Sequence, residues 1–150
     1  MNYSCETIIR LPRQRVIELF DNPDNLKEWM PGLVSFEHIS GNPGQPGAVS
    51  RLVFQLGKRK MVMTETVKVR RLPDEFTGTY DMNGVYNEVK NFFAETPEGF
   101  THYKTENYFR FTGIMKIFAW MMGSTFRKTS QDYLDRFKAF AEKQGGGSSN

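Results

Sequence analysis

Polar side chains stand at otherwise apolar positions in this sequence, and these are the residues able to do chemistry. Glu65 alternates with Met63 and Val67 in a run whose two-residue period predicts a β-strand with one apolar face. Tyr103 and Asn107 share a face of a later strand pattern. A carboxylate that faces an apolar interior is costly unless it is paired or hydrogen-bonded. Such groups therefore either pair locally or fix the polar end of a mostly apolar ligand.

The face of residues 85–95 depends on the turn that follows them. A four-residue turn at 96–99 pairs Phe92 with Tyr103 across the ladder. The interior side then also carries three further residues of this strand, namely Tyr86, Glu88 and Lys90. A slip of one residue would invert this assignment. Alternatively, the polar residues are exposed to solvent at the open end of the sheet, or Glu65 or Glu88 forms an ion pair with Lys90.

Standard catalytic and metal-binding motifs are missing from the sequence. It contains no HExxH, CxxC or GxSxG motif and no glycine-rich phosphate loop between a strand and a helix. His38 and His102 are too few for most metal sites, and His102 is expected on the exposed face opposite Tyr103. We predict no catalytic residue from a motif, no metal ligand and no cofactor.

The amino-acid composition limits the classes of protein to which this chain can belong. The net charge is only +3, with 20 basic and 17 acidic residues, so a nucleic-acid partner is not expected. Cys5 is the single cysteine and is expected to be a small buried hydrophobe. Without an intramolecular disulfide, a reducing compartment is the simpler inference, and we expect a cytoplasmic protein. No apolar stretch reaches transmembrane length, so stable membrane insertion is not expected.

Three groups of elements must position these residues. Residues 3–10 predict a strand, and two short helices follow, the first opening at Pro12 and the second capped by Asn22 with Pro23 at its first position. The next strand patterns span residues 33–40, 48–56, 60–71, 76–82, 85–95 and 100–111, with a Gly/Pro-rich loop at 41–47. Short turns between consecutive strands predict an antiparallel meander.

One long helical pattern spans residues 113–143. Met115, Phe118 and Met122 are expected to face inward, while Trp120 and Met121 lie on another side of the helix. The stretch from Ile114 to Met122 is apolar almost all the way round, so it needs partners on more than one side. We predict one domain over residues 1–143 and a disordered Gly/Ser-rich tail over 144–150.

The order of elements resembles the helix-grip order of the START-like superfamily, which includes the polyketide cyclase/dehydrase-like proteins. The local matches are LPRQRVIELFDNPDNLKEWMPG at 11–32, GNPGQPG at 41–47, the proline at position 73 and LDRFKAFAEK at 134–143. The resemblance covers residues 3–143 and implies an α+β fold: a curved antiparallel sheet of about seven strands wrapped around the long C-terminal helix, with two short helices between strands 1 and 2. It implies little about function, because one fold hosts many functions.

Together, the resemblance and the apolar periods favour a protein that binds or transports a small hydrophobic ligand, such as a lipid, a sterol-like or an aromatic, polyketide-like molecule. This interpretation predicts an internal cavity of several hundred Å³, the usual size of ligand pockets. In the resemblance, Trp29 and Met30 match the position that closes the cavity mouth, although packing against the long helix explains them equally well. The candidate ligand-binding residues are Trp29, Met30, Phe54, Met63, Glu65, Tyr80, Tyr86, Glu88, Phe92, Tyr103, Asn107, Phe109, Met115, Phe118, Met122 and Phe126.

Two other classes of function remain open. A cyclase- or dehydratase-like enzyme would use Glu65 and Tyr103 as its acid and base groups and requires a polar pair to converge inside the cavity. An interaction module would use the apolar Ile114–Met122 segment to bind a protein or a membrane surface. Either a monomer or a homodimer is compatible with the sequence.

Overall fold

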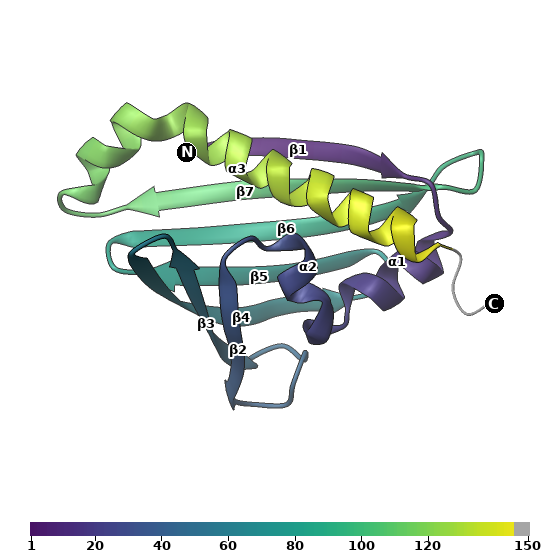
Figure 1. The fold of residues 1–150 in the computed structure, drawn as a ribbon, viewed down its shortest axis with the longest axis horizontal. Coiled ribbons are helices and arrows are strands. Elements are labelled where there is room, and N and C mark those ends of the chain that lie inside the picture. Colours follow the sequence, from purple (N-terminus) through teal and green to yellow (C-terminus); the bar gives the residue numbers. More distant parts are fainter. Residues whose placement is uncertain (146–150) are drawn as a thin grey trace.

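The computed structural model describes residues 1–145, and residues 146–150 lie outside the described part. It confirms the α+β fold: seven antiparallel strands in the order β1-β7-β6-β5-β4-β3-β2, a long C-terminal helix, and two short helices between the first two strands (Figure 1). The elements are β1 (Asn2–Ile9), α1 (Arg13–Phe20), η1 (Pro23–Asn25), α2 (Leu26–Trp29), β2 (Leu33–Ser40), β3 (Val49–Leu56), β4 (Arg59–Arg71), β5 (Glu75–Met82), β6 (Val85–Glu95), β7 (Thr101–Phe111) and α3 (Met115–Gln144).

The short helices begin where the sequence predicts. Pro12 precedes α1, and the Asn22 side chain accepts a hydrogen bond from the Asp24 backbone N–H at 3.0 Å while Pro23 occupies the first position of η1. This cap satisfies a backbone donor that the helix itself leaves unpaired. The break between α1 and η1–α2 turns the chain back beneath the second half of α3 (Figure 1).

The main core lies between these short helices, the sheet and the second half of α3. Phe137 is fully buried there and meets Trp29 edge to face, with ring centroids 5.2 Å apart. Phe93 stacks on Tyr103 at 4.6 Å, and Phe20 meets Phe93 at 5.0 Å. Aromatic rings that pack in these arrangements supply large apolar area and additional edge-to-face attraction. These rings form the most densely packed part of the interior.

The β6–β7 register corrects one prediction. Phe93, and not Phe92, pairs with Tyr103, because the turn contains five residues, 96–100, instead of four. The Thr96 hydroxyl accepts the Phe100 N–H at 3.0 Å and so holds the longer turn. The whole strand is shifted by one residue. The residues predicted to face the interior therefore lie on the outer face: Tyr86, Glu88, Lys90 and Phe92.

A bulge in β4 changes a second face assignment. Val67 pairs with Gly78 but Val69 pairs with Thr77, so Lys68 is an extra residue. An extra residue reverses the alternation of the strand beyond it. Val69, which the sequence pattern groups with Val67, therefore lies on the other face.

The edge strand β2 pairs with β3 irregularly. The register shifts between Leu33 and Ser35 and again between His38 and Ser40. The two residues left between these partners, Val34 and Ile39, are exposed.

The long helix α3 is bent. Met122 has non-helical angles (φ −115°, ψ 16°) inside it. Beyond the bend, Leu134, Phe137 and Ala141 are buried against the rest of the protein. The helix continues to Gln144, one residue into the predicted tail, and the rest of that tail, residues 146–150, lies outside the described residues.

The first half of α3 corrects the predicted inward set. Met115, Ala119 and Met122 are partly buried, whereas Phe118 is 45% exposed. Positions 115, 119 and 122 follow the i, i+4, i+7 spacing of one helix face, and Phe118 lies at the border between this face and the exposed side. Trp120 and Met121 are exposed, as their place on the helix predicts.

Candidate functional site

A row of polar side chains crosses the inner face of the sheet over four neighbouring strands. His38 on β2 is opposite Ser50 on β3, Ser50 is opposite Glu65 on β4, and Glu65 is opposite Tyr80 on β5. Residues directly opposite each other on adjacent antiparallel strands share a face and interact. We call His38, Ser50, Glu65 and Tyr80 the polar row.

A pocket of about 120 Å³ lies between this row and the η1–α2 helices. All four members of the polar row line it, together with apolar side chains that include Trp29, Met30, Phe36, Leu26, Val67 and Phe76. The volume is smaller than the several hundred Å³ that the sequence interpretation predicts. The pocket is therefore sized for a small ligand or for one end of a larger ligand.

The rim of the pocket is held by one arginine. The β4 bulge turns Arg70 to the inner face, where its guanidinium donates to the Asp21 carboxylate at 2.9 Å and to the Gly44 carbonyl at 3.2 Å. Asp21 ends α1, and Gly44 belongs to the 41–47 loop, which also lines the pocket. Arg70 therefore ties this loop to the short helices.

Glu65 and Tyr80 act on each other electrostatically. Burial raises the pKa of Glu65, and the hydrogen bond from the Tyr80 hydroxyl partly opposes that rise. Burial also raises the pKa of Tyr80 well above its usual value, and the neighbouring Glu65 carboxylate raises it further. Tyr80 therefore stays protonated and donates, while Glu65 keeps acceptor capacity for a second partner.

Tyr103 is not the partner of Glu65. Its hydroxyl donates to the Asn91 Oδ1 atom at 2.6 Å, and burial raises the pKa of Tyr103. In the register, Tyr103 pairs with Phe93, whereas the polar row meets β6 at Asn87, six positions away. The acid–base pair suggested by the sequence is therefore not assembled, and Tyr80 takes the place beside Glu65.

Trp29 carries an unpaired polar atom. The side chain is buried, with 6% of its surface exposed, and it lines the pocket while packing on Phe20 and Phe137. Its indole Nε1 is the single buried side-chain nitrogen or oxygen without a hydrogen-bond partner in the described part of the chain. Buried donors are nearly always paired, so Trp29 brings an unmet hydrogen bond to the pocket lining. The Nε1 atom itself is covered, so an acceptor reaches it only when the Trp29 ring or its neighbours shift.

The predicted site residues divide into several groups in the structure. Trp29, Met30, Glu65 and Tyr80 line the pocket. Phe54 and Tyr103 are buried in the core, and Met63 packs against it. Asn107 is buried and donates to the Thr105 hydroxyl at 3.1 Å.

A second group lies beneath the first half of α3, away from the pocket. Phe126 contacts Phe109 and Phe111, with ring centroids 5.1 and 5.3 Å apart. Met115 packs against Gly84 in the β5–β6 turn, and Met122 marks the bend of α3. Of the remaining predicted residues, Phe118 is largely exposed, and Tyr86, Glu88 and Phe92 lie on the outer face of the sheet.

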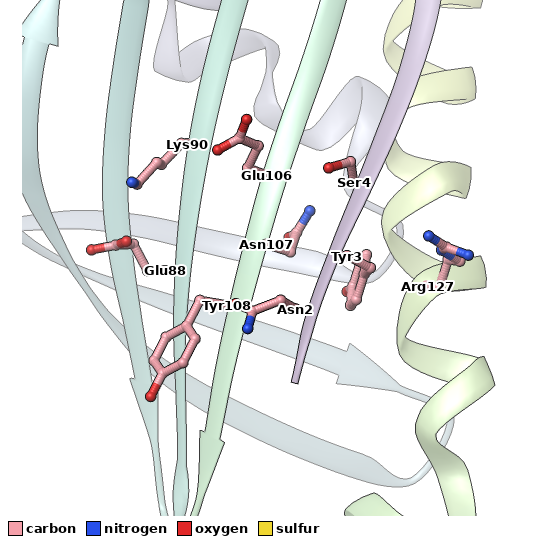
Figure 2. Close-up of a pocket in the computed structure, with 9 residues that line it drawn as sticks. All are labelled: Asn2, Tyr3, Ser4, Glu88, Lys90, Glu106, Asn107, Tyr108 and Arg127. Atoms are coloured by element: carbon pink, nitrogen blue, oxygen red, sulfur yellow. The ribbon is translucent and has the colours of Figure 1, made fainter.

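The outer face carries an open hollow of about 600 Å³ (Figure 2). Glu88 and Lys90 of β6 line it, with Glu106 and Tyr108 of β7 and Asn2 and Ser4 of β1. It reaches around the sheet edge to Tyr3, Asn107 and Arg127. Glu88 and Lys90, which the sequence pattern places on the interior face, therefore lie in solvent on the outer face of the sheet. A hollow with this polar lining does not suit an apolar ligand.

His38 and Ser50 were not among the predicted site residues, although the sequence holds the signal. Pairing Ser40 with Ala48 across the 41–47 loop and counting back places His38 opposite Ser50. The same count across the Gly57–Lys58 turn would place Ser50 opposite Glu65. Within residues 1–145, no three His, Cys, Asp or Glu side chains gather as a metal site would require.

Solved structures share this architecture over nearly the whole chain. The Zhui aromatase/cyclase from Streptomyces sp. R1128 is 13% identical with a TM-score of 0.79, over 97% of this chain and 98% of that one. A conserved protein from Geobacillus kaustophilus is 14% identical with a TM-score of 0.78, over 96% and 97%. Ara h 8.0201 is 13% identical with a TM-score of 0.75, over 95% and 98%.

These likenesses show that the chain has the helix-grip fold of START-like proteins. No family model matches the chain, and no curated protein matches its sequence. At such identities the shared fold does not carry over an activity. No helix among residues 1–145 is both long enough and apolar enough to cross a bilayer.

Proposed function

We propose that the protein binds a small, mostly apolar molecule whose polar end is a neutral hydroxyl group. The observation that carries this proposal is the unpaired Nε1 donor of Trp29, a side chain that lines an apolar pocket together with the Glu65 acceptor. A ligand hydroxyl can accept from the indole and donate to the carboxylate. A ligand without a polar group would leave the indole donor unpaired, and an anionic ligand would meet the Glu65 charge.

The apolar part of the ligand is recognised by shape and burial. Phe36, Phe76 and Met30 line the pocket beside the polar row. Aromatic and thioether side chains adapt to flat or irregular apolar skeletons. The pocket volume of about 120 Å³ suits a single ring, and a longer lipid, sterol-like or polyketide-like molecule would place only its hydroxylated end there. The aromatase/cyclase among the similar structures supports this ligand class through its fold.

A matched pair of probes tests the polar contact. p-Cresol and toluene differ by one hydroxyl group, and NMR titration follows the two indole N–H signals, which Trp120→Phe assigns. We expect p-cresol to shift the Trp29 signal and to bind more tightly than toluene. Trp29→Phe keeps an aromatic ring but removes the donor, so it should weaken p-cresol binding about 2- to 10-fold, the range for one net hydrogen bond.

The controls separate a specific contact from general loss of packing. Trp29→Phe should leave toluene binding unchanged, and Trp120→Phe should change neither probe. Equal affinity of the two probes for the wild-type protein would contradict the proposal, as would p-cresol binding that ignores Trp29→Phe. Native mass spectrometry of protein purified from its own host would identify the natural ligand class.

One observation also favours an enzyme as the second candidate: Glu65 and Tyr80 are directly opposite each other on β4 and β5 and shift each other's pKa at the same pocket. Such a pair could move a proton in a cyclase- or dehydratase-like reaction. A retained hydroxylated ligand would then lose one water over time in the wild-type protein. Glu65→Gln should stop that mass change while the ligand stays bound, whereas a ligand that remains unchanged in the wild-type protein supports binding alone.

A further inference from the structure

The first half of α3 displays an apolar face to solvent. Ile114, Ile117, Phe118 and Met121 follow the i, i+3, i+4, i+7 spacing of one helix stripe, and Trp120 flanks them. Trp120 is 86% exposed, Ile114 81%, Met121 70% and Ile117 63%. We call these five residues the α3 patch. Contiguous apolar side chains exposed to this degree mark an interaction surface.

The fold cannot cover the α3 patch. The opposite side of the same turns already faces inward through Met115, Ala119 and Met122. In Figure 1 this part of α3 lies beyond the start of β1, at one end of the molecule, before the helix turns across the sheet. The bend at Met122 separates it from the buried second half.

Charge around the α3 patch identifies the kind of surface that it fits. Between Glu106 and Asp132 the sequence contains no acidic residue and four basic ones, Arg110, Lys116, Arg127 and Lys128. The complete chain has 20 basic against 17 acidic residues, so this segment departs from the average. Lys116 and Lys128 are exposed. Asp81, in the β5–β6 hairpin that contacts Met115, is an exposed acidic residue from another element near this end of the molecule. An apolar helix face whose own segment carries only basic charges complements an anionic surface that has an apolar interior.

We infer that the α3 patch docks the protein reversibly on anionic lipid bilayers. The apolar stripe lies in the interface between headgroups and acyl chains, with Trp120 at headgroup depth, where amphipathic rings are favoured. Lys116 and Lys128 face the anionic headgroups. The docking is peripheral, because no described helix can span a bilayer. It would bring the protein to the membrane surface, independently of what the pocket binds.

The two tryptophans make this docking measurable. Trp29 is buried and Trp120 is 86% exposed, so acrylamide quenching of the free protein reports mainly on Trp120. Vesicles of phosphatidylcholine with 30% phosphatidylserine should shift the emission to the blue and protect Trp120 from acrylamide. Pure phosphatidylcholine vesicles should bind far more weakly, and raising the salt from about 0.1 to 1 M should weaken binding because it screens charge.

Paired variants test both components of the surface. Trp120→Ser with Met121→Ser should abolish vesicle flotation, whereas the control pair Val34→Ser and Ile39→Ser removes two half-exposed apolar residues from β2 and should keep it. Lys116→Glu with Lys128→Glu should lower the affinity about 25-fold or more, since each basic residue near an anionic surface contributes about 5-fold. Lys58→Glu with Lys60→Glu, in the β3–β4 hairpin, should leave affinity nearly unchanged.

Several outcomes would overturn the inference. They are no binding to anionic vesicles, equal binding to both vesicle types, and flotation of the Trp120→Ser, Met121→Ser variant like the wild type. Protection of Trp120 from acrylamide that rises with protein concentration, without vesicles, would assign the α3 patch to a second copy of the chain instead. Circular dichroism of every variant confirms that the fold is retained.

Discussion

At the residue scale, the ability of the pocket to bind a ligand depends on the hydrogen bonding of Glu65. Burial raises its pKa by disfavouring the charged carboxylate, and only the neighbouring Tyr80 hydroxyl opposes this rise. A buried carboxylate with so few partners costs stability, and a site that a ligand must complete accepts that cost. Trp29 presents the complementary case, a buried donor without an acceptor. One pocket is thus lined by Glu65, which can accept a further hydrogen bond, and by Trp29, which has a donor without a partner.

The raised pKa of Glu65 predicts a pH dependence of stability. Between the ordinary glutamate pKa and the raised folded value, the folded state binds more protons than the unfolded state, so the free energy of unfolding falls as pH rises through this window. Glu65→Gln removes this contribution. We therefore expect the variant to gain stability relative to the wild type between about pH 4 and neutral pH. Urea denaturation across this range measures the difference, and a constant difference would contradict the prediction.

At the element scale, the sequence predicted which segments form helices and strands better than it predicted how the strands pair. Pro12, Asn22 and Pro23 mark helix starts by local chemistry, and the structure confirms them. The β6 faces were wrong because the sequence did not reveal the five-residue turn, which backbone bonds between Thr96, Gly99 and Phe100 and the Thr96 hydroxyl close. The side of Val69 was wrong because a bulge leaves no clear mark in an alternating pattern.

The same limit applies to the candidate site. Glu65 and Tyr80 could be placed from their own strands, because each belongs to a clear alternation. Their pairing could not, since it requires the β4–β5 register with its bulge. The Trp29 donor is unpredictable from sequence, because an unpaired atom is known only when all its neighbours are known.

The bend of α3 leads to a prediction at Gly123. A Cβ added there meets no atom within 4 Å, and the residue does not have a positive φ. Gly123→Ala should therefore raise the free energy of unfolding by about 0.5–1 kcal/mol by reducing the freedom of the unfolded chain. Thermal or urea unfolding measures this gain.

Gly84 provides the matched control for that measurement. Its φ is +77°, and an added Cβ would lie 2.8 Å from the Met115 Cγ atom. Gly84→Ala should destabilise the protein by about 1–2 kcal/mol, because side chains disfavour this backbone region. A loss of stability at Gly123 as large as that at Gly84 would show that the bend itself requires glycine.

At the scale of the whole molecule, the interior is unevenly packed. Phe137, Trp29 and Tyr103 fill the half beneath the second part of α3. The other half has only partly buried side chains, such as Phe109, beneath a helix segment whose outer side is bare. Regions with few buried contacts open more readily than the core.

Amide hydrogen exchange should show this division. Residues 115–122 are expected to exchange at least ten-fold faster than residues 132–141, because opening the first segment exposes little buried surface. Anionic vesicles should slow exchange in the first segment only. Uniform protection along α3 without vesicles would mean that the helix is held as one rigid unit.

The backbone of the edge strand β2 affects how readily copies of this protein aggregate. A free sheet edge is a template onto which another chain can add by hydrogen bonding, and this route leads to aggregates. Here the regular edge is interrupted twice, where Val34 and Ile39 fall out of register. Only the short stretch from Ser35 to His38 runs regularly between the two interruptions. The backbone irregularity thereby shortens the edge that another chain could extend, even though the residues that create it are apolar.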